Sequence, residues 1–118
     1  GVDYYMPPER INTTSAKKYT KPPDFASDVY QIGLLMYVVL YHCLPFKGFI
    51  WEELAVAIKE GDAAFPERGA NGFLVPQKLK RIVQTCLAKD PEKRYPNAAA
   101  IWNEFVAYAF KTKEFSIN

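Results

Sequence analysis

The sequence predicts an all-helical protein in which one central, buried helix is ringed by shorter helices. A long, almost entirely apolar stretch runs from Phe25 to Tyr41, and three later stretches place apolar residues at i, i+3, i+4 and i+7 spacing. No stretch gives a convincing strand pattern. The length of 118 residues suits one domain or part of one, and 49% hydrophobic residues support a packed core.

The first half of the chain is predicted to contain a short helix, a loop and the central helix. Pro7-Pro8-Glu9-Arg10 can open a short helix, because proline is tolerated in a first turn and glutamate suits the positive helix end. Residues 12–23 are polar and rich in turn formers, so a loop is expected. Asp24 can cap the helix predicted from about Phe25 to Tyr41. The continuous apolar stretch Ile32–Leu40, which continues with interruptions to Leu44, is shorter than the ~20 residues of a membrane span, so it indicates a helix buried in a globular protein.

The second half of the chain is predicted to form three amphipathic helices. One covers roughly Trp51 to Glu60 and stops at Gly61, a second begins near Pro76, and the last follows a cap at Asn97. Residues 62–75 should be an irregular connection, and the tail 112–118 should fray. The expected core-facing residues are Trp51, Leu54, Ala55, Ile58, Leu79, Ile82, Val83, Cys86, Leu87, Ala98, Ile101, Trp102, Phe105, Tyr108 and Ala109.

Charge and sulfur content restrict the possible partners and the compartment. The net charge is only +2 and the basic residues are dispersed, which argues against nucleic acid or an acidic membrane as a partner. Cys43 and Cys86 are expected to be buried free thiols in a reducing compartment, and no signal peptide is visible, so a cytoplasmic location is expected. His42, the only histidine, lacks a nucleophile partner or a ligand cluster, so no metal site is expected.

Five short motifs follow one another along the chain in an order typical of protein kinases. Gly1 to Glu9 resembles the end of an activation segment, G-T-x-x-Y-x-A-P-E, and Asp28 to Gly33 resembles the D-x-W-x-x-G of the central C-lobe helix. Leu44-Pro45-Phe46 is similar to P-P-F. Glu53 to Pro66 is similar to E-L-x-x-x-I-x-x-G-x-x-x-F-P, and Cys86 to Arg94 to C-L-x-x-D-P-x-x-R. Residues 1–118 thus resemble the C-terminal part of the C-lobe of a serine/threonine or tyrosine-kinase-like catalytic domain, the helical portion of that α+β fold.

The resemblance implies a substrate-docking loop at the beginning of the chain. Val2, Asp3, Tyr4 and Tyr5 correspond to the loop that receives the substrate residue after the phosphoacceptor. Val2 departs from the family, which usually has a threonine whose hydroxyl contacts the catalytic aspartate and lysine. Because valine cannot make this hydrogen bond, the resemblance also admits a pseudokinase.

The resemblance also implies structural roles for five residues. Pro8 and Glu9 correspond to the P-E motif, and Glu9 is expected to form an ion pair with Arg94. Asp28 corresponds to the residue that accepts hydrogen bonds from the catalytic-loop backbone. Gly33 lies in a helix interior, where close helix packing is the expected reason for a glycine.

The sequence contains none of the kinase motifs that bind ATP or carry out phosphoryl transfer. G-x-G-x-x-G, H-R-D and D-F-G strings do not occur, so no catalytic, cofactor-binding or metal residue is expected in this chain. Mg-ATP is implied only for a complete kinase domain. The expected partners are the N-terminal remainder of such a domain or a second copy of the chain, and a protein substrate. Two alternatives stay open, namely a pseudokinase scaffold fragment and a self-contained helical interaction module.

Overall fold

The computed structural model describes residues 5–11 and 24–112, and these residues confirm the all-α prediction. Within these ranges the chain forms four α-helices and two short 3-10 helices, and its only β-bridge joins Arg68 to Leu74. The elements in chain order are η2 (Pro8–Arg10), α1 (Phe25–Tyr41), α2 (Trp51–Glu60), α3 (Gln77–Cys86), η3 (Pro91–Lys93) and α4 (Ala98–Thr112).

Local hydrogen bonds fix both ends of α1 where the sequence predicts them. The Asp24 carboxylate accepts a hydrogen bond from the Ser27 N–H at 2.9 Å, which satisfies a first-turn donor. At the other end His42 adopts a left-handed conformation with φ 55°, and its N–H donates to the Val38 carbonyl at 2.8 Å.

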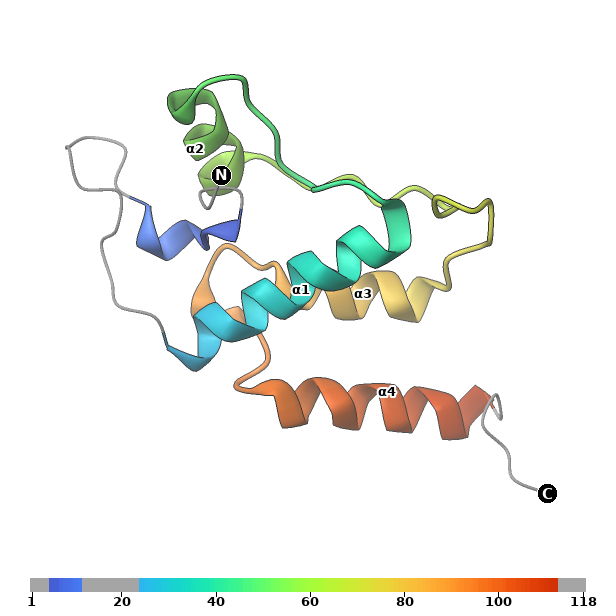
Figure 1. Ribbon diagram of the computed structural model, residues 1–118. Helices are drawn as coiled ribbons and strands as arrows, with labels where there is room; N and C mark the ends of the chain where they lie inside the picture. Colours follow the sequence, from blue (N-terminus) through green and yellow to red (C-terminus); the bar gives the residue numbers. More distant parts are fainter. Residues whose placement is uncertain (1–4, 12–23, 113–118) are drawn as a thin grey trace.

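The core lies mainly between α1 and α3, which run side by side (Figure 1). Tyr30, Leu34, Val83 and neighbouring apolar residues are almost completely buried there. Gly33 faces the end of α3 so closely that an added Cβ atom would lie 2.6 Å from the Cβ atom of Cys86. Glycine therefore allows the two helices to approach each other, which is the reason expected from the sequence.

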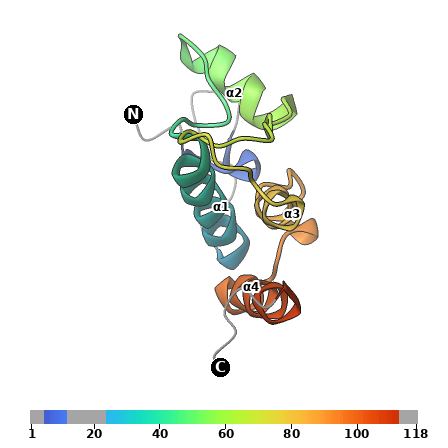
Figure 2. The same cartoon turned by 90° about the vertical axis from the view of Figure 1, so that its right-hand side faces the viewer.

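Helices α2 and α4 lie on opposite sides of the α1–α3 pair, as the two perpendicular views show (Figures 1 and 2). On one side Leu54 and Ile58 of α2 pack with Met6 and Ile11, which flank η2. On the other side Ile101 of α4 packs with residues of α1 and α3. The segment around η2 is thereby held against α2.

Four details differ from the predictions. Trp102 was expected in the core but is 66% exposed, because it lines the groove between α3 and α4 on a part of the apolar face of α4 that its neighbours leave uncovered. Ala98 was also expected to face the core but is exposed in the first turn of α4. Cys43 is exposed, because it follows the end of α1 in an irregular segment. The last helix continues through Thr112, whereas fraying was expected from residue 112; residues 113–118 lie outside the described part.

Helix α1 is buried on one side and carries large apolar residues on the other. Tyr30 and Leu34 are 0% exposed, whereas Leu35 is 64% and Val39 66% exposed. Over residues 5–11 and 24–112, no helix combines the length and the apolar character required to cross a membrane.

Candidate functional site

The turn between α3 and α4 places Arg94 in the interior. Asp90 begins this turn, and its carboxylate accepts a hydrogen bond from the Glu92 N–H at 3.0 Å. Pro91 opens the 3-10 helix η3, and the Arg94 N–H closes it by donating to the Pro91 carbonyl at 3.2 Å. The Arg94 side chain then points back towards α1 and is 0% exposed.

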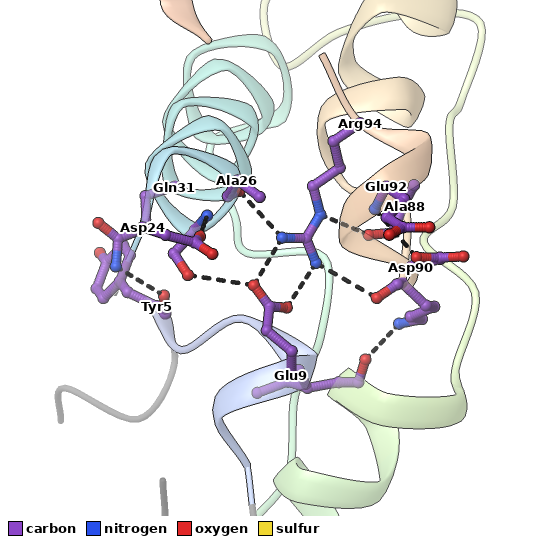
Figure 3. A network of polar contacts seen from close by, with 12 residues as sticks. Tyr5, Glu9, Asp24, Ala26, Gln31, Ala88, Asp90, Glu92 and Arg94 are labelled. Atoms are coloured by element: carbon purple, nitrogen blue, oxygen red, sulfur yellow. Dashed lines mark hydrogen bonds and ion pairs between the residues drawn. The ribbon is translucent and has the colours of Figure 1, made fainter. Parts of the chain in front are cut away.

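Glu9 meets the guanidinium of Arg94 in a two-pronged ion pair (Figure 3). Arg94 Nη2 donates to Glu9 Oε1 at 2.7 Å, and Nη1 donates to Oε2 at 2.8 Å. The Glu9 side chain is only 8% exposed, and its Oε2 also accepts a hydrogen bond from Ser27 Oγ at 3.1 Å. The pair joins positions that are 85 residues apart in the chain.

The remaining donors of Arg94 hold backbone carbonyls. Nε donates to the Ala88 carbonyl at 2.7 Å, Nη1 to that of Ala26 at 3.0 Å, and Nη2 to that of Lys89 at 3.4 Å. Guanidinium has five N–H donors, so these bonds and the two to Glu9 use all of them. One side chain therefore ties together η2, the start of α1 and the turn after α3. We call this cluster the Glu9–Arg94 clasp.

The electrostatics of the clasp favour ionised Glu9. Burial opposes ionisation of this carboxyl, but the hydrogen bonds and positive charge of Arg94, with the Ser27 hydrogen bond, outweigh it and lower the Glu9 pKa. The Tyr30 ring lies against the guanidinium with its centroid 4.9 Å away, and burial raises the pKa of its hydroxyl strongly. Within the described residues this hydroxyl has no hydrogen-bond partner.

The other residues singled out in the sequence lie apart from the clasp or beside it. Pro8 is buried at the start of η2. Asp28 is exposed in the first turn of α1, and its carboxylate has no hydrogen bond or ion pair within the described ranges. Tyr5 is 50% exposed, and its carbonyl accepts a weak hydrogen bond from Gln31 Nε2 at 3.4 Å.

Val2, Asp3 and Tyr4 of the predicted docking loop lie outside the described residues. Ser27 and Tyr30 belong to the clasp but were not predicted as part of it. A serine in the first turn of a helix is also typical of simple capping, so the sequence held no separate signal for a contact with Glu9.

The arrangement is suited to holding segments together rather than to chemistry. All donors of Arg94 are engaged within the protein, and both Glu9 oxygens accept from it. Residues 5–11 and 24–112 contain no group of three or more His, Cys, Asp and Glu residues that could bind a metal ion. The clasp is thus a structural junction next to the predicted docking loop.

Comparison with known proteins gives matches along nearly the whole chain, although no family model matches it. The chain is 31% identical over 109 residues to serine/threonine-protein kinase PknL of Mycobacterium tuberculosis, covering 92% of this chain and 25% of that kinase. It is 30% identical over 121 residues to serine/threonine-protein kinase PrkC of Bacillus subtilis, and the match covers 99% of this chain and 17% of that kinase. It is 27% identical over 118 residues to human receptor-interacting serine/threonine-protein kinase 1, and the match covers 99% of this chain and 16% of that kinase.

The chain spans a quarter or less of the length of these curated relatives. The matching segment is nevertheless almost the complete chain, and its all-helical architecture agrees with the helical part of a kinase C-lobe. The chain is therefore a homologue of the serine/threonine protein kinases.

Proposed function

We propose that this chain is the substrate-docking and scaffold part of a serine/threonine protein kinase C-lobe, which takes part in phosphoryl transfer to protein hydroxyls when the rest of the domain is present. The observation that carries the proposal is the clasp. A buried, bidentate pair joins the P-P-E segment at Glu9 to the turn at Arg94, where the resemblance to kinases implies an ion pair.

The clasp would support docking by fixing the segment that follows the docking loop. Glu9 is anchored to Arg94 and Ser27, and Tyr5 is tethered to Gln31 of α1. A loop whose exit is held in this way loses less conformational entropy when it binds a substrate peptide. Mg-ATP and the catalytic residues would come from the preceding part of the domain.

Exposed apolar side chains support the N-terminal remainder of the domain as a partner. On α1, Leu35 and Val39 are 64% and 66% exposed, and on α4, Trp102 and Phe110 are 66% and 73% exposed. An apolar groove of about 510 Å³ lies between the start of α3 and α4. Large exposed apolar patches mark contact surfaces, so covering by further chain is the favoured explanation. A cytoplasmic location completes the proposal, because two free cysteines suit a reducing compartment.

A chimaeric kinase tests the proposal. The matching segment of the Bacillus subtilis kinase would be replaced by this chain, and phosphate transfer to a serine/threonine protein substrate would be measured. We expect a folded, active chimaera, whose activity falls when Arg94→Ala breaks the clasp. A chimaera that does not fold, beside a parent kinase that does, would contradict the C-lobe assignment.

Val2 favours a pseudokinase scaffold as the second candidate. If the full domain is inactive because the threonine hydroxyl is missing, the chimaera should fold and bind ATP but transfer no phosphate. Val2→Thr should then restore transfer without changing ATP affinity. Equal activity of the chimaera with and without the Val2→Thr substitution would remove the reason for this second candidate.

A further inference from the structure

A second site lies between the end of α2 and the turn after α3. It is a cavity of about 380 Å³ with apolar walls from Phe46, Phe65 and Leu87, and with Asp62 and Lys89 at its polar side. The clasp uses only the backbone carbonyl of Lys89. The Lys89 side chain, which comes from a residue that lines the cavity, has no part in the function proposed above.

The Lys89 amine is fixed in place by a ring contact and a hydrogen bond. Its Nζ lies over the Phe46 ring, 3.9 Å from the centroid, and donates to the Ile58 carbonyl in the last turn of α2. Carbonyls of a last turn lack an intrahelical donor, so this bond fixes the amine against the helix end. Burial lowers the pKa of Lys89 to about 8; the Arg94 charge acts in the same direction, and the Asp62 charge opposes both.

We propose that this cavity is a modification site, at which the Lys89 amine accepts a short acyl group from an acyl thioester. The aromatic and aliphatic walls provide a place for the apolar acyl chain. The contacts of Nζ with the Phe46 ring and the Ile58 carbonyl hold the nucleophile in one position. Near neutral pH a substantial fraction of the amine is in the neutral, nucleophilic form.

The reaction needs only the thioester as co-reactant. The nitrogen lone pair of neutral Lys89 attacks the thioester carbonyl carbon, and a C–N bond forms as the C–S bond breaks. The thiolate leaves with the electron pair of the C–S bond, and the nitrogen releases its extra proton to water. The amide product keeps one N–H for the Ile58 carbonyl but loses the positive charge over the Phe46 ring.

Acetylation by a small thioester tests the proposal on the 118-residue chain. The chain would be treated at pH 7.4 with limiting S-acetyl-N-acetylcysteamine, and each lysine would be quantified by peptide mass spectrometry. Lys59 is an internal control, because it also donates to a carbonyl, that of Ile11 at 3.4 Å, but is exposed. We expect Lys89 to react about tenfold faster, since a larger neutral fraction is partly offset by a weaker nucleophile. Equal or slower reaction at Lys89 would overturn the proposal.

Two further measurements show whether the reactivity of Lys89 depends on the folded cavity or only on the residues that neighbour Lys89 in the sequence. In urea the Lys89 preference should disappear, and a preference that persists in the unfolded chain would overturn the proposal. In the folded chain the Lys89 rate should level off as the pH rises above about 8, the pKa of this amine. A Lys89 rate that is still rising tenfold per pH unit between pH 9 and pH 10 would also overturn it. Lys89→Arg confirms the peptide assignment by removing the signal.

Discussion

At the scale of single residues, Arg94 uses all five of its side-chain N–H donors within the described part of the protein. Arg94→Ala would leave the Glu9 carboxylate, which is only 8% exposed, without its counter-ion. We expect the free energy of unfolding to fall by about 3–5 kcal/mol, as measured by urea denaturation. Arg94→Lys should lower the free energy of unfolding by a smaller amount, because lysine keeps the positive charge. Some stability is still lost, since lysine cannot form the two-pronged contact with Glu9.

The Lys78–Glu104 pair on the surface is a matched control for this prediction. Its atoms are 3.0 Å apart, but its side chains are 38% and 39% exposed. Exposed ion pairs contribute little to the free energy of unfolding, so Lys78→Ala should lower it by less than about 1 kcal/mol. If Arg94→Ala and Lys78→Ala lowered the free energy of unfolding by similar amounts, burial would not be the reason that the clasp stabilises the protein.

The lowered pKa of Glu9 predicts a specific pH dependence of stability. Since the folded-state pKa lies below the ordinary value of 4.5, ionised Glu9 stabilises the fold above pH 4.5. This contribution is lost as the pH falls through the folded-state pKa. The difference in unfolding free energy between the unmodified chain and Glu9→Gln should therefore be constant near neutral pH and shrink below pH 4.5. Urea titrations from pH 7 to pH 3 measure it, and a difference that grows on acidification would contradict it.

At the scale of elements, the approach of α1 to α3 depends on Gly33. Alanine normally improves a helix interior by about 1 kcal/mol over glycine. Here its Cβ atom would lie 2.6 Å from Cys86 Cβ and 3.1 Å from Leu87 Cδ2. We expect Gly33→Ala to destabilise the protein by about 1–3 kcal/mol in thermal or urea unfolding, because the helices must separate. Higher stability of Gly33→Ala would show that α1 and α3 are not closely packed.

The helices themselves could be predicted well, because their signals are local. Asp24 as a cap, Gly61 as a stop and the apolar spacing in α2 and α3 act within a few residues, and the structure confirms these element boundaries. Trp102 was misplaced because periodicity assigns a residue to an apolar face without showing how much of that face a neighbour covers. Within the described ranges, α1 and α3 cover only part of the apolar face of α4.

The candidate site could be predicted only in part, because its contacts join distant segments. No spacing rule links Glu9 to Arg94 across 85 residues, and only the resemblance to kinases suggested that they meet. The backbone carbonyls of Ala26 and Ala88 carry no sequence signal, since any residue could supply them. The same holds for the cavity at Lys89, which exists only because α2 and the turn after α3 come together.

At the scale of the whole molecule, the sequence contains none of the known phosphate-binding motifs of a kinase. We therefore expect no magnesium-dependent ATP binding by the chain alone in isothermal titration calorimetry. The chimaeric kinase described above is the positive control, because it contains the missing motifs. Micromolar affinity of the isolated chain for ATP would contradict this prediction.

The exposed apolar side chains predict how the isolated chain behaves in solution. Burying a large apolar side chain such as Leu35 or Val39 contributes about 1.5–3 kcal/mol, which is large beside the ~5–15 kcal/mol stability of a typical domain. Without a covering partner the chain should therefore self-associate. Light scattering after size-exclusion chromatography should show a mass that increases with protein concentration.

Charge placed on the outer side of α1 should reverse this association. Leu35→Glu combined with Val39→Lys should shift the chain towards monomer, because both side chains already face solvent and their replacement leaves the α1–α3 core intact. Val56→Lys on α2, where the side chain is 51% exposed, is the matched control and should leave the mass unchanged. If the unmodified chain is a cooperatively melting monomer at every concentration, its exposed apolar side chains do not require a partner that buries them. That result would favour a self-contained helical module over a part of a kinase domain.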